Sequence, residues 1–118
     1  MRRRKTSPRR PWLETGMVLC LCGLPAAPAA YAGELTAGRQ SELRNLVLQD
    51  CGSCHGMTLK GGLGSPLLPG DLDGVEAATI AQIVLDGIPD TPMPPWRGLL
   101  SDKDALWIAQ ALKSGDIK

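Results

Sequence analysis

The chain contains no phenylalanine, only one histidine, His55, and just three tryptophans and one tyrosine among its 118 residues. A single histidine excludes metal sites that combine several imidazoles. The lack of large aromatic side chains leaves little material for a core made of protein alone. A domain this small therefore needs another source of stability, such as a disulfide, a metal or a buried prosthetic group.

Long apolar segments are also absent. The apolar run near the start, residues 17–24, is too short to span a bilayer as a stable helix. It follows a segment with six basic side chains and precedes Ala30-Tyr31-Ala32, which matches the small-x-small pattern of a cleavage site. We therefore predict a signal peptide over residues 1–32, removed after Ala32, and a mature domain over residues 33–118 in the periplasm. An uncleaved membrane anchor is the alternative.

Removal of residues 1–32 changes both the charge and the cysteine count. Of the 13 basic and 12 acidic side chains, 7 basic and 11 acidic ones remain, so the formal charge moves from +1 to −4. An acidic domain binds nucleic acid poorly, which excludes that class of partner. Only Cys51 and Cys54 remain as thiols. We expect a monomer that does not insert stably into the membrane after cleavage.

Both remaining thiols belong to Cys51-Gly52-Ser53-Cys54-His55, the pattern of covalent c-type haem attachment. Two cysteines at this spacing form thioether bonds to the two vinyl groups along one porphyrin edge. The histidine that follows lies beneath the iron and supplies its proximal nitrogen ligand. The sequence therefore predicts one covalent haem c held by Cys51, Cys54 and His55. A buried porphyrin would also supply the apolar area that the chain lacks.

Two other interpretations of the same five residues are weaker. A zinc site needs a third and a fourth thiolate or imidazole; His55 is the only histidine of the chain, so no fourth ligand of these types is left. A thioredoxin-like dithiol follows a β-strand and opens a helix, but no alternating or β-branched run precedes Cys51. A dithiol oxidoreductase stays as the minor alternative.

The residues before the motif favour a helix over residues 36–50 that leads straight into Cys51. Leu43, Leu46 and Val47 share one face of this helix. Other side chains are available for its solvent side, namely Arg39, Glu42 and Arg44.

A long loop is predicted after the motif, because residues 56–72 contain five glycines and two prolines. The leucines in this stretch oppose disorder, so we expect an ordered loop that wraps the haem edge. A proximal histidine donates its second ring N–H to an acceptor that fixes its orientation. The carbonyl of Ser65 or that of Pro66 is the candidate acceptor.

Two further helices are predicted. The first is capped by Asp73 or Thr79, each followed three residues later by Glu or Gln, and it ends at Gly87. The second has Ser101 as its N-cap, acidic residues in its first turn and Gly115 beyond its end. Their predicted buried residues are Ile80, Ile83, Val84 and Leu85 in the first, and Ala105, Ile108, Ala109 and Leu112 in the second.

A proline-rich segment, Thr91-Pro92-Met93-Pro94-Pro95-Trp96, lies between these two helices. Prolines hold the backbone extended on both sides of Met93 and present its side chain at low entropic cost. A thioether on the face opposite histidine is a common sixth ligand of carrier haems and raises the reduction potential. Met93 is the candidate distal ligand, because Met57 lies too close to His55 in the chain to reach the far face.

These motifs, together with the Pro66 loop and a last helix carrying Trp107, resemble the class I c-type cytochromes over most of residues 36–114. The resemblance implies an all-α fold of about three to four helices around one haem, with the first and last helices crossing. It also implies a low-spin histidine–methionine haem and single-electron transfer through an exposed haem edge. We therefore expect a non-enzyme, since a haem peroxidase or gas-binding enzyme needs an open sixth position and a distal acid–base residue.

The run from Leu85 to Leu99 has a narrower resemblance, to the small periplasmic cytochromes found with dissimilatory nitrite reductase. This resemblance implies periplasmic redox partners and electron donation to nitrite reductase in denitrification. The alternative that it implies is an electron acceptor or accessory factor in maturation of the nitrite reductase haem.

One feature departs from the class I pattern. A small residue usually lies eight positions before the first cysteine and an aromatic residue four before it, where the terminal helices cross. Here these positions hold Leu43 and Val47. The crossing must therefore be packed differently, and Trp107 is expected to pack on the haem or on the first helix.

Overall fold

The computed structural model describes residues 34–117, so the predicted signal peptide over residues 1–32 lies outside the described residues. The described part of the chain is helical and contains no strand, which confirms the predicted all-α class. Within the same residues, no helix has the length and apolar character needed to cross a membrane.

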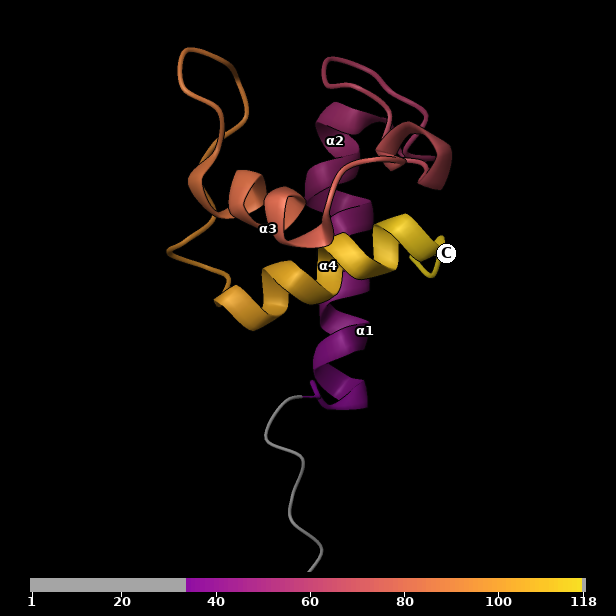
Figure 1. The fold of residues 1–118 in the computed structure, drawn as a ribbon, viewed down its shortest axis with the longest axis vertical. Coiled ribbons are helices and arrows are strands. Elements are labelled where there is room, and N and C mark those ends of the chain that lie inside the picture. Colours follow the sequence, from indigo (N-terminus) through magenta and orange to yellow (C-terminus); the bar gives the residue numbers. More distant parts are fainter. Residues whose placement is uncertain (1–33, 118) are drawn as a thin grey trace, which may run out of the picture. The chain divides into compact units, whose positions relative to one another are not determined.

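The first element is a long rod that ends in the cysteine motif (Figure 1). It consists of α1 (Ala37–Leu46), a π-helical turn η1 (Val47–Cys51) and α2 (Gly52–His55). Thr36 caps its start, and the Thr36 hydroxyl accepts a hydrogen bond from Arg39 N at 3.2 Å. The predicted helix and its run into the motif are therefore confirmed.

The π turn changes which side of the rod faces the core. Leu43 and Val47 are fully buried, and α-helical spacing would next bring Cys51 to the same side. Instead, the N–H of Gly52 bonds the carbonyl of Val47, five residues earlier, and Gly52 is buried while Cys51 is only half-buried. The wider turn thus leaves the Cys51 sulfur at the margin of the core rather than inside it.

A short 3₁₀ turn, η2 (Pro69–Leu72), leads to the second long helix, α3 (Ala77–Asp86). The N-cap of α3 is Glu76, whose side chain makes no capping bond, so the predicted caps Asp73 and Thr79 are wrong. The predicted end at Gly87 is confirmed. Ile83 was expected to be buried, but the residue is 40% exposed because it lies at the edge of the α3 face that buries Ile80, Val84 and Leu85.

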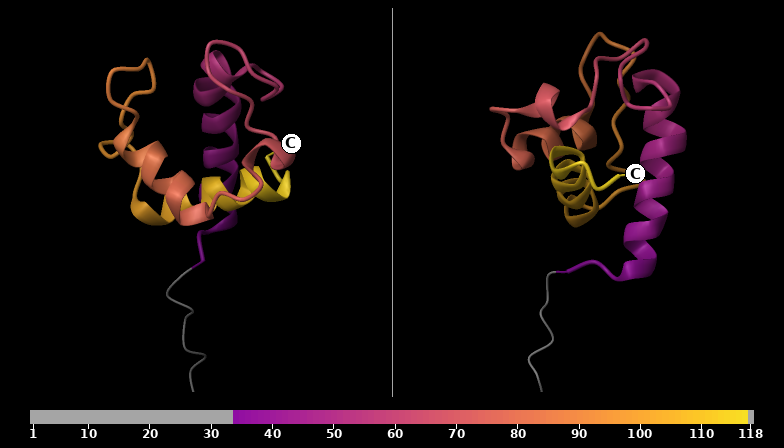
Figure 2. Two further views of the ribbon diagram at one scale, coloured as in Figure 1. Left: turned by 45° about the horizontal axis from the view of Figure 1, so that its top comes forward. Right: turned by 90° about the vertical axis from the view of Figure 1, so that its right-hand side faces the viewer.

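The last helix, α4 (Asp102–Ser114), crosses α1 partway along its length (Figure 2). Ser101 and Asp104 form a reciprocal capping box, and Gly115 ends the helix in a left-handed conformation with φ +82°. Large buried residues on α1 and η1 share one core with the buried alanines of α4. The crossing therefore carries its small residues on the last helix instead of the first. The residues concerned are Leu43, Val47, Ala105 and Ala109.

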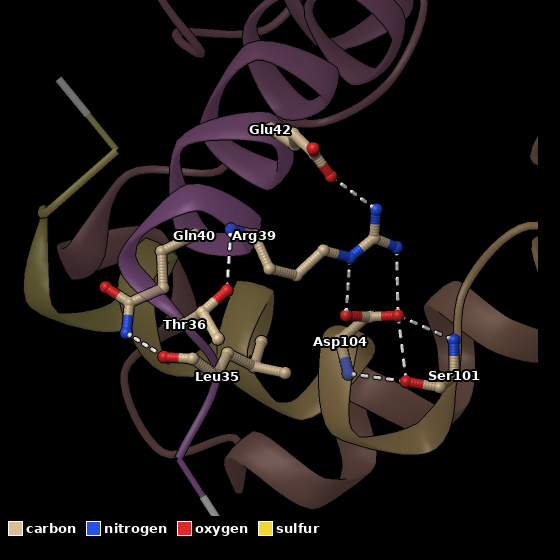
Figure 3. A network of polar contacts seen from close by, with 7 residues as sticks. All are labelled: Leu35, Thr36, Arg39, Gln40, Glu42, Ser101 and Asp104. Atoms are coloured by element: carbon tan, nitrogen blue, oxygen red, sulfur yellow. Dashed lines mark hydrogen bonds and ion pairs between the residues drawn. The ribbon is translucent and has the colours of Figure 1, made fainter.

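An ion pair joins α1 and α4 near the start of both helices (Figure 3). Arg39 donates from Nε and Nη2 to the two carboxylate oxygens of Asp104, both at 3.0 Å. This contact differs from the expectation that Arg39 faces solvent alone. The arginine, with burial opposing, lowers the pKa of Asp104 to about 2. Trp107 of α4 packs against the first helix. The Arg44 guanidinium carbon lies 5.1 Å from the centroid of the Trp107 ring.

Candidate functional site

The two thiols lie on the last two turns of the rod. Burial, and then the negative charge of Asp50, raise the pKa of the free Cys51 thiol to about 11. Reactive dithiols instead use the positive end of a helix, its N-terminus, to lower a thiol pKa. Cys51 and Cys54 lie at the C-terminal end of a continuous helix. Their position therefore disfavours a dithiol oxidoreductase.

His55 is the last residue of α2, and its ring is held by one contact with the loop that follows. Nδ1 lies 2.7 Å from the carbonyl oxygen of Ser65, so the acceptor predicted as Ser65 or Pro66 is Ser65. A carbonyl can only accept, so Nδ1 carries the hydrogen and Nε2 keeps its lone pair for a metal. A Cβ on Gly64 would lie 2.7 Å from Nδ1 and from Cε1 of the ring. Gly64 therefore lies flat against the imidazole, where no side chain fits.

The loop over residues 56–68 is ordered by the carbonyl groups that the end of the rod leaves free. Gly61 N–H donates to His55 O at 2.8 Å, and Gly64 N–H donates to Cys54 O at 2.9 Å. Gly56 reverses the chain with φ +86°, and a Cβ there would lie 2.5 Å from Gly61 O. The glycine-rich composition thus gives an ordered loop, but the predicted span of residues 56–72 is too long because η2 forms over Pro69–Leu72.

Met93 lies in the loop after α3, and Figures 1 and 2 show this loop and the one after α2 rising at the same end of the fold. The Met93 side chain is half-buried and packs against the core. Met93 O accepts from Ile88 N at 3.2 Å, which closes the loop at its base. A Cβ on Gly87 would lie 2.7 Å from Met93 O, so the loop rests directly on the Gly87 backbone.

Exposed apolar side chains gather on these same two segments. Among the large hydrophobic residues of the described chain, six are exposed, and four of these belong to α3 or to the two loops. They are Met57, Leu63, Ile83 and Ile88. Such surface is costly in water and suits a large apolar ring. Two thiols, an imidazole with a free nitrogen, a thioether and apolar walls together fit haem c. No group of three or more His, Cys, Asp or Glu side chains within residues 34–117 suits a metal ion alone.

Three residues that the sequence did not single out for the site shape it in the structure. Gly64 supports the imidazole, Gly87 supports the Met93 loop as well as ending α3, and Arg97 bonds both α3 and α4 at the base of that loop. The glycines were visible only as loop or stop signals, because a close approach between distant backbone segments leaves no local pattern. The partners of Arg97 are likewise set by the tertiary fold.

Comparison with known proteins gives consistent similarities. Residues 38–110, which include Cys51, His55 and Met93, match the family model described as Cytochrome C oxidase, cbb3-type, subunit III. The chain is 51% identical to Cytochrome c55X of Paracoccus denitrificans (strain Pd 1222) over 86 residues, 73% of this chain and 84% of that protein. A solved structure titled c-type cytochrome NirC has a TM-score of 0.69 and 53% identity, covering 70% of this chain and 98% of that one.

A longer protein is similar over part of its length. Dihydro-heme d1 dehydrogenase of Pseudomonas aeruginosa is 35% identical over 83 residues, which cover 70% of this chain but 16% of that protein. The similarity is therefore to one segment of a larger enzyme.

Proposed function

Because the chain belongs to the cytochrome c family, we propose that it is a periplasmic carrier that passes single electrons to nitrite reductase in denitrification. Bound haem c supplies one iron that alternates between the ferrous and ferric states. The observation that carries the proposal is the geometry at the end of the rod, where η1 and α2 hold two thiols and a histidine whose Nδ1 lies against the Ser65 carbonyl.

Four residues of the chain would bind the one haem. In this proposal, Cys51 and Cys54 form the thioether bonds, His55 Nε2 is the proximal ligand and Met93 Sδ is the distal ligand. A fixed ligand on each face keeps the coordination sphere the same in both oxidation states, so electron transfer needs little rearrangement. The same two ligands leave no open position for a substrate. These roles make the protein a carrier and not an enzyme.

The surface around the site suggests how a partner docks. Met57, Leu63 and Ile88 are exposed around the two loops and suit a small, transient apolar contact. Asp86 lies at the base of the Met93 loop, but its charge is paired with Arg97 at 2.7 Å. Asp90 is exposed and has no ion pair among the described residues. We therefore propose that Asp90 and the formal charge of −4 favour a basic patch on the reductase.

Stopped-flow oxidation of the reduced protein by nitrite reductase tests this function. We expect fast transfer whose rate falls as salt rises, because screening weakens long-range attraction. Asp90→Asn should lower the rate at low salt. Glu34→Gln removes the same charge at the opposite end of the rod and should leave it unchanged. Slow transfer that ignores ionic strength would contradict the carrier function.

The similarity to part of dihydro-heme d1 dehydrogenase favours a second candidate function, an electron acceptor in maturation of the nitrite reductase haem. A deletion strain separates the two functions. Loss of a carrier leaves a fully assembled reductase that lacks its electron supply. Loss of a maturation factor leaves a reductase without its special haem.

The proposal also requires export, with removal of residues 1–32. The periplasmic protein should then begin at Gly33 and have the mass of residues 33–118 plus one haem. Intact-protein mass spectrometry measures both, and a chain that still begins at Met1 would instead support the uncleaved anchor.

A further inference from the structure

The two ends of the loop over residues 87–98, which carries Met93, are joined by backbone hydrogen bonds. We call this closed part of the loop, next to the end of α3, its neck. Trp96 N–H donates to Leu85 O at 3.0 Å, and Arg97 N–H donates to the same oxygen at 3.2 Å. On the other side of the neck, Ile88 N–H donates to Met93 O. The last carbonyl groups of α3 are thus capped by the returning end of the loop, so α3 and the loop form one unit.

The Arg97 side chain fastens this neck to two helices. Its Nε lies 2.7 Å from Asp86 Oδ1 at the end of α3, and its Nη1 lies 3.2 Å from Asp102 Oδ1 at the start of α4. Gln82 also donates to the Asp86 carboxylate and holds it in place. Arg97 is the only described residue of the loop over residues 87–98 whose side chain forms an ion pair.

The chain between Arg97 and Met93 is short and stiff. Only three residues separate them, and two of these are Pro94 and Pro95, whose φ angles are fixed by their rings. A shift of the neck at Arg97 is therefore transmitted to Met93 instead of being absorbed between them. We propose that Arg97 is a positioning residue that keeps the Met93 sulfur at the haem iron. This inference rests on the proposed role of Met93 as distal ligand.

Imidazole binding to the oxidised holoprotein tests the inference, because imidazole takes the sixth position only after Met93 leaves. Loss of the weak near-infrared band of methionine–iron(III) coordination reports the exchange. At saturating imidazole, we expect Arg97→Gln to exchange about fivefold faster than the wild type, as suits one half-exposed ion pair and a second that is more exposed. Lys103→Gln is the matched control: it removes the same charge from an exposed residue of α4 that has no ion pair within residues 34–117.

The salt dependence of the exchange rate gives a second test. High salt weakens exposed ion pairs, so it should accelerate exchange in the wild type and in Lys103→Gln but not in Arg97→Gln.

Equal exchange rates in all three proteins would overturn the inference. So would a faster exchange in Arg97→Gln that is matched by an equal rise in its rate of global unfolding, since Arg97 would then stabilise only the fold. A wild type without the near-infrared band would overturn the ligand role of Met93 and this inference with it. A wild type that has the band, with unchanged exchange in Arg97→Gln, would overturn this inference alone.

Discussion

Replacement of Asp104 by asparagine tests the contact that fixes α1 against α4. The Asp104 side chain is only 8% exposed, and its carboxylate accepts two hydrogen bonds from Arg39 and two from Ser101. Asparagine keeps an oxygen for the cap of α4 but removes the negative charge opposite Arg39. The variant therefore removes the ion pair, with an amide NH2 in place of the oxygen that accepts from Arg39 Nε, while the helix cap keeps its acceptor.

The size of the effect follows from the pKa of this carboxyl group. Hydrogen bonds from Arg39 are the largest cause that lowers the pKa of Asp104 from 3.8 to about 2. A shift of this size corresponds to roughly 2 kcal/mol of stability at neutral pH. Arg39 is 35% exposed, so water screens part of the attraction. We expect Asp104→Asn to lower the free energy of unfolding by about 1 to 2 kcal/mol at pH 7.

The effect must also vary with pH in a defined direction. A carboxyl group with a lowered folded-state pKa contributes its full stability above its unfolded pKa and loses it as pH falls through the folded value. The difference between the wild type and Asp104→Asn should thus be constant from pH 7 to about pH 5. It should fall to about half at pH 3 and to about a sixth at pH 2, and disappear only at lower pH.

Denaturant unfolding of the holoprotein, followed by far-ultraviolet circular dichroism across this pH range, measures the difference. Glu42→Gln is the matched control, because Glu42 is the second partner of Arg39 but is 68% exposed. It should cost less than about 0.5 kcal/mol. Equal losses in the two variants, or a loss for Asp104→Asn that does not change between pH 7 and pH 3, would refute the reasoning.

Two further predictions concern glycines at the haem site. Gly64→Ala should displace the His55 ring, because the new methyl group would lie 2.7 Å from Nδ1, and it should therefore lower the yield of haem-loaded protein. Gly70→Ala is the control and should leave this yield unchanged, because a methyl group there would have nothing within 4 Å. Absorbance of purified holoprotein per chain measures this yield. Gly87→Ala should lift the Met93 loop, because the methyl group would lie 2.7 Å from Met93 O and the backbone has φ +67°. The near-infrared methionine–iron(III) band should weaken in this variant and persist in Gly98→Ala, and an unchanged band in Gly87→Ala would contradict the packing described here.

The sequence was sufficient to predict features that depend on neighbouring residues. Ser101, Asp104 and Gly115 gave the correct bounds of α4, because capping and left-handed stops depend on residues within one turn. The helix that leads into Cys51 was also predictable from the spacing of its apolar residues. The caps Asp73 and Thr79 were wrong, since several residues near the start of α3 can cap a helix and tertiary packing decides among them.

Features set by distant contacts were not predictable. Ile83 fits the apolar face of α3 by spacing, yet it lies at the edge of that face, and only the packing of the neighbouring elements decides that it stays exposed. The pairing of Arg39 with Asp104 joins residues 65 positions apart, and no local pattern selects that partner. The Ser65 carbonyl was one of two candidates, because the path of a glycine-rich loop depends on where its backbone hydrogen bonds close.

A redox titration of the purified mature protein tests the central claim most directly. One haem c held by Cys51, Cys54, His55 and Met93 should give a reversible curve that fits a single one-electron Nernst equation, with one electron taken up per chain. The methionine–iron(III) band should appear as the protein is oxidised and vanish as it is reduced. A curve that requires two centres, or an oxidised form that never shows this band, would contradict the account.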